Sequence, residues 1–178
     1  MMDSVTGAGR ECLLPFLSKG VTQIAWVVED VEKSVRTFHA LFGVGPWHFY
    51  RYGRPLLSMM RRNGKEVEYA METAVANAGA TRLEFIQPTE GDTIFHEFVR
   101  KHGYGKVHHF GLAVENMHEA LRIVREGGIN VTMEGSGYGL DGDGYFAFLD
   151  TEDLVGTTLE LMERPKRRHE PQQVFPPA

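Results

Sequence analysis

Two stretches of the chain repeat one pattern of hydrophobic and polar positions. Segments 21–38 and 107–124 superpose at an offset of 86 residues, with apolar side chains in matching places. Each begins with about seven mostly apolar residues, which predicts a strand. Each then spaces its apolar residues i, i+4, i+7, which predicts an amphipathic helix. The change falls at Asp30 and Asn116, residue types that favour helix N-caps. The sequence therefore predicts two copies of a strand followed by a helix.

Further strand-like segments follow each predicted helix. They are residues 65–75 and 81–87 in the first copy, and residues 144–150 and 157–163 in the second. A short connecting helix is expected between the copies, over residues 93–103. We interpret each copy as a βαβββ module, in which these segments are two of the three strands after the helix, and the fold class is α+β with two tandem modules.

The predicted modules leave both ends of the chain outside the repeat. Module one covers about residues 21–88 and module two about residues 107–163. Residues 1–20 are expected to form an N-terminal arm, and the proline-rich residues 164–178 a C-terminal tail, as arms or flexible ends.

Four polar side chains occupy equivalent places in the two copies. Gln23 and His109 stand at the entrance of a strand face that is otherwise lined by small residues. Glu84 and Glu160 each lie within an apolar strand, where a lone carboxylate is costly to bury and is relieved by a cation, a metal or protonation. If the modules pair about a pseudo-twofold axis, the four side chains converge. An imidazole, two carboxylates and an amide oxygen then predict a divalent-metal site.

Composition narrows the class of protein further. The 178 residues are 42% hydrophobic and 24% charged, with a formal net charge of −5, which gives no basic excess for binding nucleic acid. The single cysteine, Cys12, excludes an intrachain disulfide, and no apolar run is long enough to span a membrane. A soluble, cytoplasmic protein without nucleic-acid or membrane partners is therefore expected.

The repeat, together with the phrases "HHFGLAV", "LEFIQP" and "TTLELME", resembles the vicinal oxygen chelate superfamily of glyoxalase and bleomycin-resistance-like proteins. The resemblance covers about residues 20–163, assigned here as one domain over 21–163. It implies a curved mixed sheet around a metal-binding cup, with a divalent ion (Zn, Co, Ni, Mn or Mg) as the cofactor. The family's ligands fall on Gln23, Glu84, His109 and Glu160. Relatives also form dimers, so a homodimer is expected.

Two branches of the superfamily remain open. The phrase "KVHHFGLAVENMHEAL" is most similar to methylmalonyl-CoA epimerases, whereas the ligand set Gln, Glu, His, Glu matches zinc-type glyoxalase I enzymes. The segment "VEYAM" resembles the epimerase strand that carries a non-ligand glutamate base, which implies that role for Glu68. Glu68 and Glu160 would then serve as acid–base groups on the two faces of an enolate.

The expected function is a metal-dependent epimerase or racemase that inverts a stereocentre next to a carbonyl by 1,1-proton transfer. The alternatives are a glyoxalase-like isomerase or lyase, an extradiol dioxygenase, and a metal-free small-molecule binding protein. The substrate is expected to be an aromatic or apolar ketone, or an acyl-CoA, because aromatic residues flank the predicted cup. The glycine-rich segment 134–144 is expected to form a mobile lid, with Tyr138 as its contact.

Overall fold

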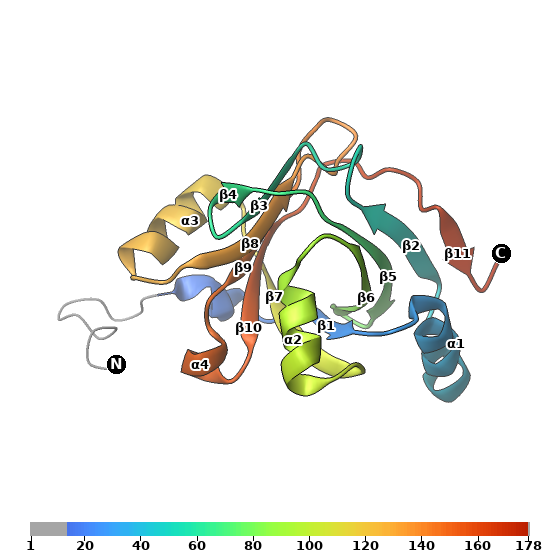
Figure 1. The fold of residues 1–178 in the computed structure, drawn as a ribbon. Coiled ribbons are helices and arrows are strands. Elements are labelled where there is room, and N and C mark those ends of the chain that lie inside the picture. Colours follow the sequence, from blue (N-terminus) through green and yellow to red (C-terminus); the bar gives the residue numbers. More distant parts are fainter. Residues whose placement is uncertain (1–13, 178) are drawn as a thin grey trace.

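The computed structural model describes residues 14–177, which build one mixed sheet of eleven strands (Figure 1). The neighbouring strands follow the order β11–β2–β5–β6–β1–β7–β10–β9–β8–β3–β4. The sheet curls strongly (Figure 1). Helices α1 and α3 lie on its outer side, whereas α2 packs against the inner face, where its Ile94 and Phe95 join a buried cluster with Ile86 and Phe148. The predicted α+β fold with a curved mixed sheet is confirmed.

Each module consists of one strand, one helix and three further strands. Module one contains β1 (Gln23–Val27), α1 (Val31–Phe42), β2 (Trp47–Tyr52), β5 (Ala70–Ala78) and β6 (Thr81–Glu90). Module two contains β7 (Lys106–Ala113), α3 (Met117–Glu126), β8 (Val131–Ser136), β9 (Tyr145–Leu149) and β10 (Thr158–Glu163). The remaining elements are the 3-10 helix η2 (Pro15–Lys19), β3 (Met59–Arg62), β4 (Lys65–Glu66), α2 (Ile94–His102), α4 (Glu152–Val155) and β11 (Gln173–Phe175).

The modules meet along their first strands. β1 and β7 pair antiparallel, and each also pairs parallel with the last strand of its own module, β6 or β10. Four strands, one after another, therefore form the centre of the sheet. The two copies of the repeat therefore lie side by side in one sheet with their first strands antiparallel, as the predicted pseudo-twofold axis requires.

Both predicted helix starts are confirmed. The Asp30 side chain accepts a hydrogen bond from the Lys33 amide at 2.8 Å, and the Asn116 side chain accepts one from the Glu119 amide at 3.0 Å. Each cap satisfies an amide at the helix terminus that has no partner within the helix. The backbone therefore turns from strand to helix at the same place in both modules.

Strand alternation separates an outer face from an inner face. On β7, Leu112 faces outward and packs with Met117 and Leu121 of α3 in one buried cluster. His109 and Gly111, of opposite parity, face the inside of the curl. The outer side therefore holds α1 and α3, and the part of the inner side that α2 does not cover is left for a site.

Two parts of the sheet differ from the prediction. The expected strand over 65–75 is divided, because β3 and β4 form a hairpin that pairs with β8 of module two, and β5 starts only at Ala70. The C-terminal tail is not a free end: β11 pairs antiparallel with β2 of module one. Of the expected N-terminal arm, residues 1–13 lie outside the described part, and η2 contacts β7.

The glycine-rich segment also differs from the prediction. Residues 134–136 belong to β8, so part of the expected lid is a paired strand. Tyr138 is buried and its hydroxyl donates a hydrogen bond to the Glu163 carbonyl at 3.2 Å. Gly139 forms a β-bridge with Arg168 of the C-terminal segment. Within residues 14–177, no helix is long and apolar enough to cross a membrane.

Candidate metal centre

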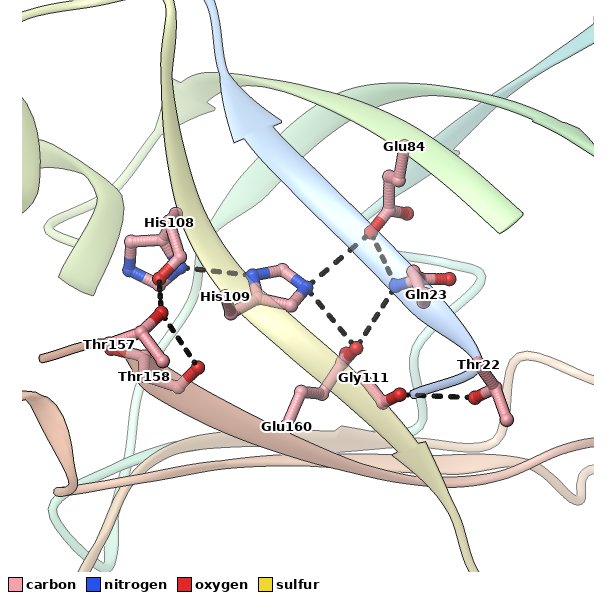
Figure 2. Close-up of polar contacts among 9 residues, drawn as sticks. All are labelled: Thr22, Gln23, Glu84, His108, His109, Gly111, Thr157, Thr158 and Glu160. Carbon is pink, nitrogen blue, oxygen red and sulfur yellow. Dashed lines mark hydrogen bonds and ion pairs between the residues drawn. The ribbon is translucent and has the colours of Figure 1, made fainter. Parts of the chain in front are cut away.

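The four side chains expected at a metal site lie on the four central strands. Gln23 is on β1, Glu84 on β6, His109 on β7 and Glu160 on β10, and all four are buried. Figure 2 shows them pointing toward one another on the inner face of the sheet. The structure thus brings together residues that are far apart in the sequence.

Their polar atoms converge within a few ångströms. Gln23 Nε2 donates hydrogen bonds to Glu84 Oε2 at 2.8 Å and to Glu160 Oε2 at 3.0 Å (Figure 2). His109 Nε2 lies 3.2 Å from Glu160 Oε2 and 3.8 Å from Glu84 Oε2. One ligand atom each from Glu84, His109 and Glu160 lie within 4.8 Å of one another.

Two carboxylates this close cannot both ionise without compensation. Burial and, next, the nearby charge of Glu160 raise the pKa of Glu84 to about 7, although the charges of His109, Arg82 and Arg168 oppose the shift. A cation at the point of convergence would neutralise both carboxylates. The electrostatics of the site therefore favour a bound positive charge.

The donor set fits a divalent metal. Among the described residues, His109 Nε2 is buried and makes no hydrogen bond, so its lone pair is available at the centre. Its other nitrogen, Nδ1, lies 3.0 Å from His108 Nδ1. Burial keeps the pKa of His108 well below its usual value, so this neighbour stays neutral and fixes the ring of His109. The Gln23 amide would be a ligand through Oε1 only after rotation, which exchanges its oxygen with the Nε2 that now faces the carboxylates.

Gly111 provides the space in which these side chains meet. A Cβ atom at this position would lie 2.5 Å from Met162 Cε, 2.7 Å from Gln23 Cβ and 3.1 Å from Glu160 Oε2. Any larger side chain would displace two of the four polar residues. The site therefore requires a glycine at position 111, which lies opposite Gln23 on β1 and Glu160 on β10.

A small cavity of about 30 Å³ opens directly onto the polar centre. Its wall is made of Gln23, Tyr52, Met71, Arg82, Glu84, Ile86, Tyr138, Phe146, Phe148, Glu160, Met162 and Arg168. A larger cavity, about 640 Å³, lies on the outer side near Trp26 and α1, and none of the four polar residues lines it. The small cavity is identified as the candidate site by the buried polar side chains that line it, and not by its size.

Glu68, the expected base, is not brought to this centre. Its side chain is 80% exposed, lies between β4 and β5, and faces Arg54 Nε at 3.7 Å. It does not line the cavity. The hairpin β3–β4 interrupts the strand on which the resemblance placed Glu68, and this explains the difference.

The aromatic side chains expected around the cup divide between the two faces of the sheet. Tyr52, Tyr138 and Phe146 line the cavity. Trp47 and Phe49 pack in the outer core, and the Tyr145 hydroxyl donates a hydrogen bond to Glu134. The cavity therefore has an aromatic wall, made of fewer residues than the sequence suggested.

Two arginines at the cavity were not anticipated. Arg82 precedes Glu84 by two residues, so strand alternation alone placed it on the inner face. Arg168 lies in the C-terminal segment, where no periodic pattern pointed to the site.

The fold and this centre define the class of protein. A family model described as the Glyoxalase/Bleomycin resistance protein/Dioxygenase superfamily matches residues 22–148, and the chain belongs to this superfamily. Methylmalonyl-CoA epimerase, mitochondrial, from Bos taurus is 28% identical over 94 residues, which are 53% of this chain and 53% of that protein. The chain thus matches about half the length of this curated relative.

Solved structures of similar proteins show the same fold. Methylmalonyl-CoA epimerase from Mycobacterium tuberculosis has a TM-score of 0.58 and 17% identity, covering 89% of this chain and 94% of that one. A variant of the Streptomyces coelicolor methylmalonyl-CoA epimerase, in complex with 2-nitronate-propionyl-CoA, has a TM-score of 0.58 and 19% identity. That match covers 84% of this chain and 96% of the other.

Proposed function

We propose that this chain is a metal-dependent epimerase or racemase that inverts a stereocentre next to a carbonyl by 1,1-proton transfer. The observation that carries the proposal is the buried group of Glu84, His109 and Glu160, whose donor atoms lie within 4.8 Å of one another. The similarity to methylmalonyl-CoA epimerases supports the choice of reaction.

Glu84, His109, Glu160 and the rotated amide of Gln23 would hold the ion. When bound there, a divalent metal acts as a Lewis acid that polarises a substrate carbonyl and makes the neighbouring C–H more acidic. The aromatic and aliphatic wall of the cavity excludes water, which strengthens these electrostatic effects.

The chain's own groups move the proton. Glu160 is the proposed proton-transfer carboxylate, because it is buried at the cavity and faces its interior. Tyr52 lines the same cavity, and burial raises its pKa to about 12, so its hydroxyl stays protonated at neutral pH. Tyr52 is the proposed donor that returns a proton to the opposite face of the enolate after Glu160 has removed the α-proton, and both groups then exchange protons with solvent to return to their starting states. The exposed Glu68 is not assigned a role in this proposal.

Two classes of substrate are proposed. Acyl-CoA thioesters come first, because the similar proteins are methylmalonyl-CoA epimerases. Aromatic or apolar ketones come second, because Tyr52, Tyr138 and Phe146 line the cavity. A cytoplasmic location and a homodimer stay predictions, and the similar bovine protein is a mitochondrial one.

The test is solvent exchange at the α-carbon. The metal-loaded protein is incubated in deuterated water with single enantiomers of methylmalonyl-CoA, of other 2-methylacyl thioesters and of aromatic α-substituted ketones. Inversion with deuterium at that carbon is the expected result, and Glu160→Gln should abolish it. Glu68→Gln should invert at the wild-type rate, and a loss there would return Glu68 to the mechanism.

The same experiment separates the alternatives. A glyoxalase-like enzyme, which the donor set Gln, Glu, His, Glu also fits, would move hydrogen to the adjacent carbon and give a constitutional isomer of a hydroxyketone adduct. A binding protein would hold the ligands without any exchange. The absence of α-exchange with every thioester and ketone tested would refute the proposed reaction.

A further inference from the structure

Two arginines that are far apart in the sequence, Arg82 and Arg168, line the cavity at the metal centre. Arg82 projects from β6 on the same face as Glu84, and Arg168 comes from the segment after β10. Both line the cavity at the metal centre, and both also line an adjoining cavity of about 170 Å³ next to His48 and Tyr50. The pair therefore stands where the site opens outward.

Neither guanidinium forms a close ion pair within residues 14–177, although the buried carboxylate of Glu84 lies near enough to attract both charges. The structure gives Arg82 and Arg168 no ion pair and no side-chain hydrogen bond. By contrast, Arg51, Arg62 and Arg167 each pair with a carboxylate of a surface residue. Two half-buried cations that repel each other mark a place prepared for an anion.

The position of Arg168 is fixed by the backbone around it. Gly139 bridges to Arg168, the Leu140 amide donates to the Arg167 carbonyl at 3.0 Å, and the Lys166 amide donates to Asp143 Oδ2 at 2.8 Å. Further along, the Gln172 amide donates to the Phe49 carbonyl at 2.9 Å, and β11 then joins β2. Figure 1 shows this segment running from β10 past the glycine-rich loop to β2. Residues 164–175, which we call the strap, are therefore held by backbone contacts with both modules.

The charge balance of the site points to the occupant. A divalent cation would neutralise Glu84 and Glu160, and the positive charges of Arg82 and Arg168 would then have no partner at the cavity. Arginine presents a planar fork of donors that matches carboxylate and phosphate oxygens. We propose that Arg82 and Arg168 form an oxyanion-binding pair that holds an anionic group of the substrate, so that the C-terminal segment completes the active site. This inference rests on the proposed function, since it assigns a substrate to the same cavity.

The test measures binding rather than turnover. The metal-loaded full chain is titrated by calorimetry with malonate, which offers carboxylates without phosphate, and with propionyl-CoA, which offers phosphates without a free carboxylate. Arg82→Met and Arg168→Met should each raise the Kd of one probe about 10-fold or more, the loss expected for a charge-assisted contact. An effect on malonate identifies a carboxylate site, and an effect on propionyl-CoA identifies a phosphate site.

Matched variants keep the result specific. Arg167→Met removes the neighbouring guanidinium, which pairs with Asp141 outside the cavity, and should leave both Kd values within about threefold of wild type. Arg168→Lys keeps the charge but loses the fork, so an intermediate Kd is expected. Thermal unfolding checks each variant, and if Arg82→Met does not fold, Arg168→Met decides alone.

Three results would refute the proposal that Arg82 and Arg168 bind an anion. They are wild-type protein that binds neither probe, arginine variants that bind the probes as tightly as wild type does, or a loss of affinity in Arg167→Met equal to that in Arg168→Met. Probe binding that depends on both arginines, in a protein without α-exchange, would refute the proposed function and leave the anion site standing.

Discussion

The two modules share a backbone plan but contribute different chemistry to the site. Asp30 and Asn116 cap equivalent helices, and Glu84 and Glu160 lie on equivalent strands. At the entrance, however, module one carries the amide of Gln23 and module two the imidazole of His109. An imidazole nitrogen is a stronger donor to a transition metal than a neutral amide oxygen. The fold is nearly symmetric, and module two would supply the dominant neutral ligand to a bound metal.

At the outer edges of the sheet, the edge strand of each module pairs with a strand that does not belong to that module. The edge strand β2 of module one is covered by β11, which follows module two in the chain. The edge strand β8 of module two is covered by the β3–β4 hairpin, which belongs to module one. An uncovered edge strand exposes unpaired backbone groups. Each module therefore protects the other, and neither is expected to be stable alone.

The largest effect is expected from making the two entrances identical. His109→Gln gives module two the residue of module one, and it should weaken binding of a divalent transition metal about 100-fold or more, because the imidazole ligand is lost. Gln23→His gives the reverse symmetry and should bind the metal at least as tightly as wild type. Metal content and competition titration with a chromophoric chelator measure both effects.

The exposed His118 on α3 supplies a control, since His118→Gln makes the same chemical change away from the cavity. Equal metal affinities in His109→Gln and Gln23→His would show that the difference between the modules has no consequence for the metal.

The next largest effect is expected where the modules touch. Gly111→Ala places a Cβ atom 2.5 Å from Met162 Cε and 2.7 Å from Gln23 Cβ, so the two central strands must shift. The free energy of unfolding should fall by about 1–3 kcal/mol, the usual cost of overpacking, and metal affinity should fall with it. Urea denaturation and metal titration check this. Adding Met162→Ala removes one of the clashes and should recover part of the stability, and no recovery would show that the strain lies elsewhere.

A smaller effect is expected in how stability depends on pH, through the buried carboxyl group of Glu84 in module one. Its folded-state pKa is raised to about 7, from an ordinary 4.5, by burial and by Glu160. Between these values the folded state holds a proton that the unfolded state has lost, so the stability from protonated Glu84 is present below 4.5 and is lost as the pH rises through 7. The unfolding temperature of the metal-free protein should therefore fall by a few degrees between about pH 5 and about pH 7.5.

Metal affinity should change in the opposite direction, rising over the same pH window as the carboxylate loses its proton. Thermal unfolding in a chelating buffer tests the stability, and Glu84→Gln should flatten its pH dependence. A wild-type unfolding temperature that rises with pH would contradict the assigned shift.

The parts of the molecule that follow the repeat could be predicted, and the parts that break it could not. Periodicity placed both helices and their caps, and the equivalent positions of Glu84 and Glu160 pointed to one shared site. The β3–β4 hairpin and β11 pair with strands far away in the sequence, and no local pattern encodes a distant edge. Arg168 reaches the cavity because its segment bridges Gly139 and continues into β11, which pairs with β2, so its place depends on tertiary contacts. Glu68 was assigned by resemblance, and the hairpin beside it changed its surroundings.

The smallest effect is expected at the edge that β11 protects. Phe175 packs its ring 5.4 Å from that of His39, and the Arg36 guanidinium lies 4.7 Å above it. Phe175→Ala removes these contacts from the outer core of module one, and it should lower the free energy of unfolding by about 1 kcal/mol, because the side chain is only partly buried. Metal affinity should not change, since β11 covers β2 from the side away from the metal centre. Urea denaturation gives the stability, and Val174→Ala, an exposed neighbour on the same strand, is the matched control. If Phe175→Ala instead removed probe binding at Arg168 while Val174→Ala did not, the strap rather than the strand edge would be the main role of this segment.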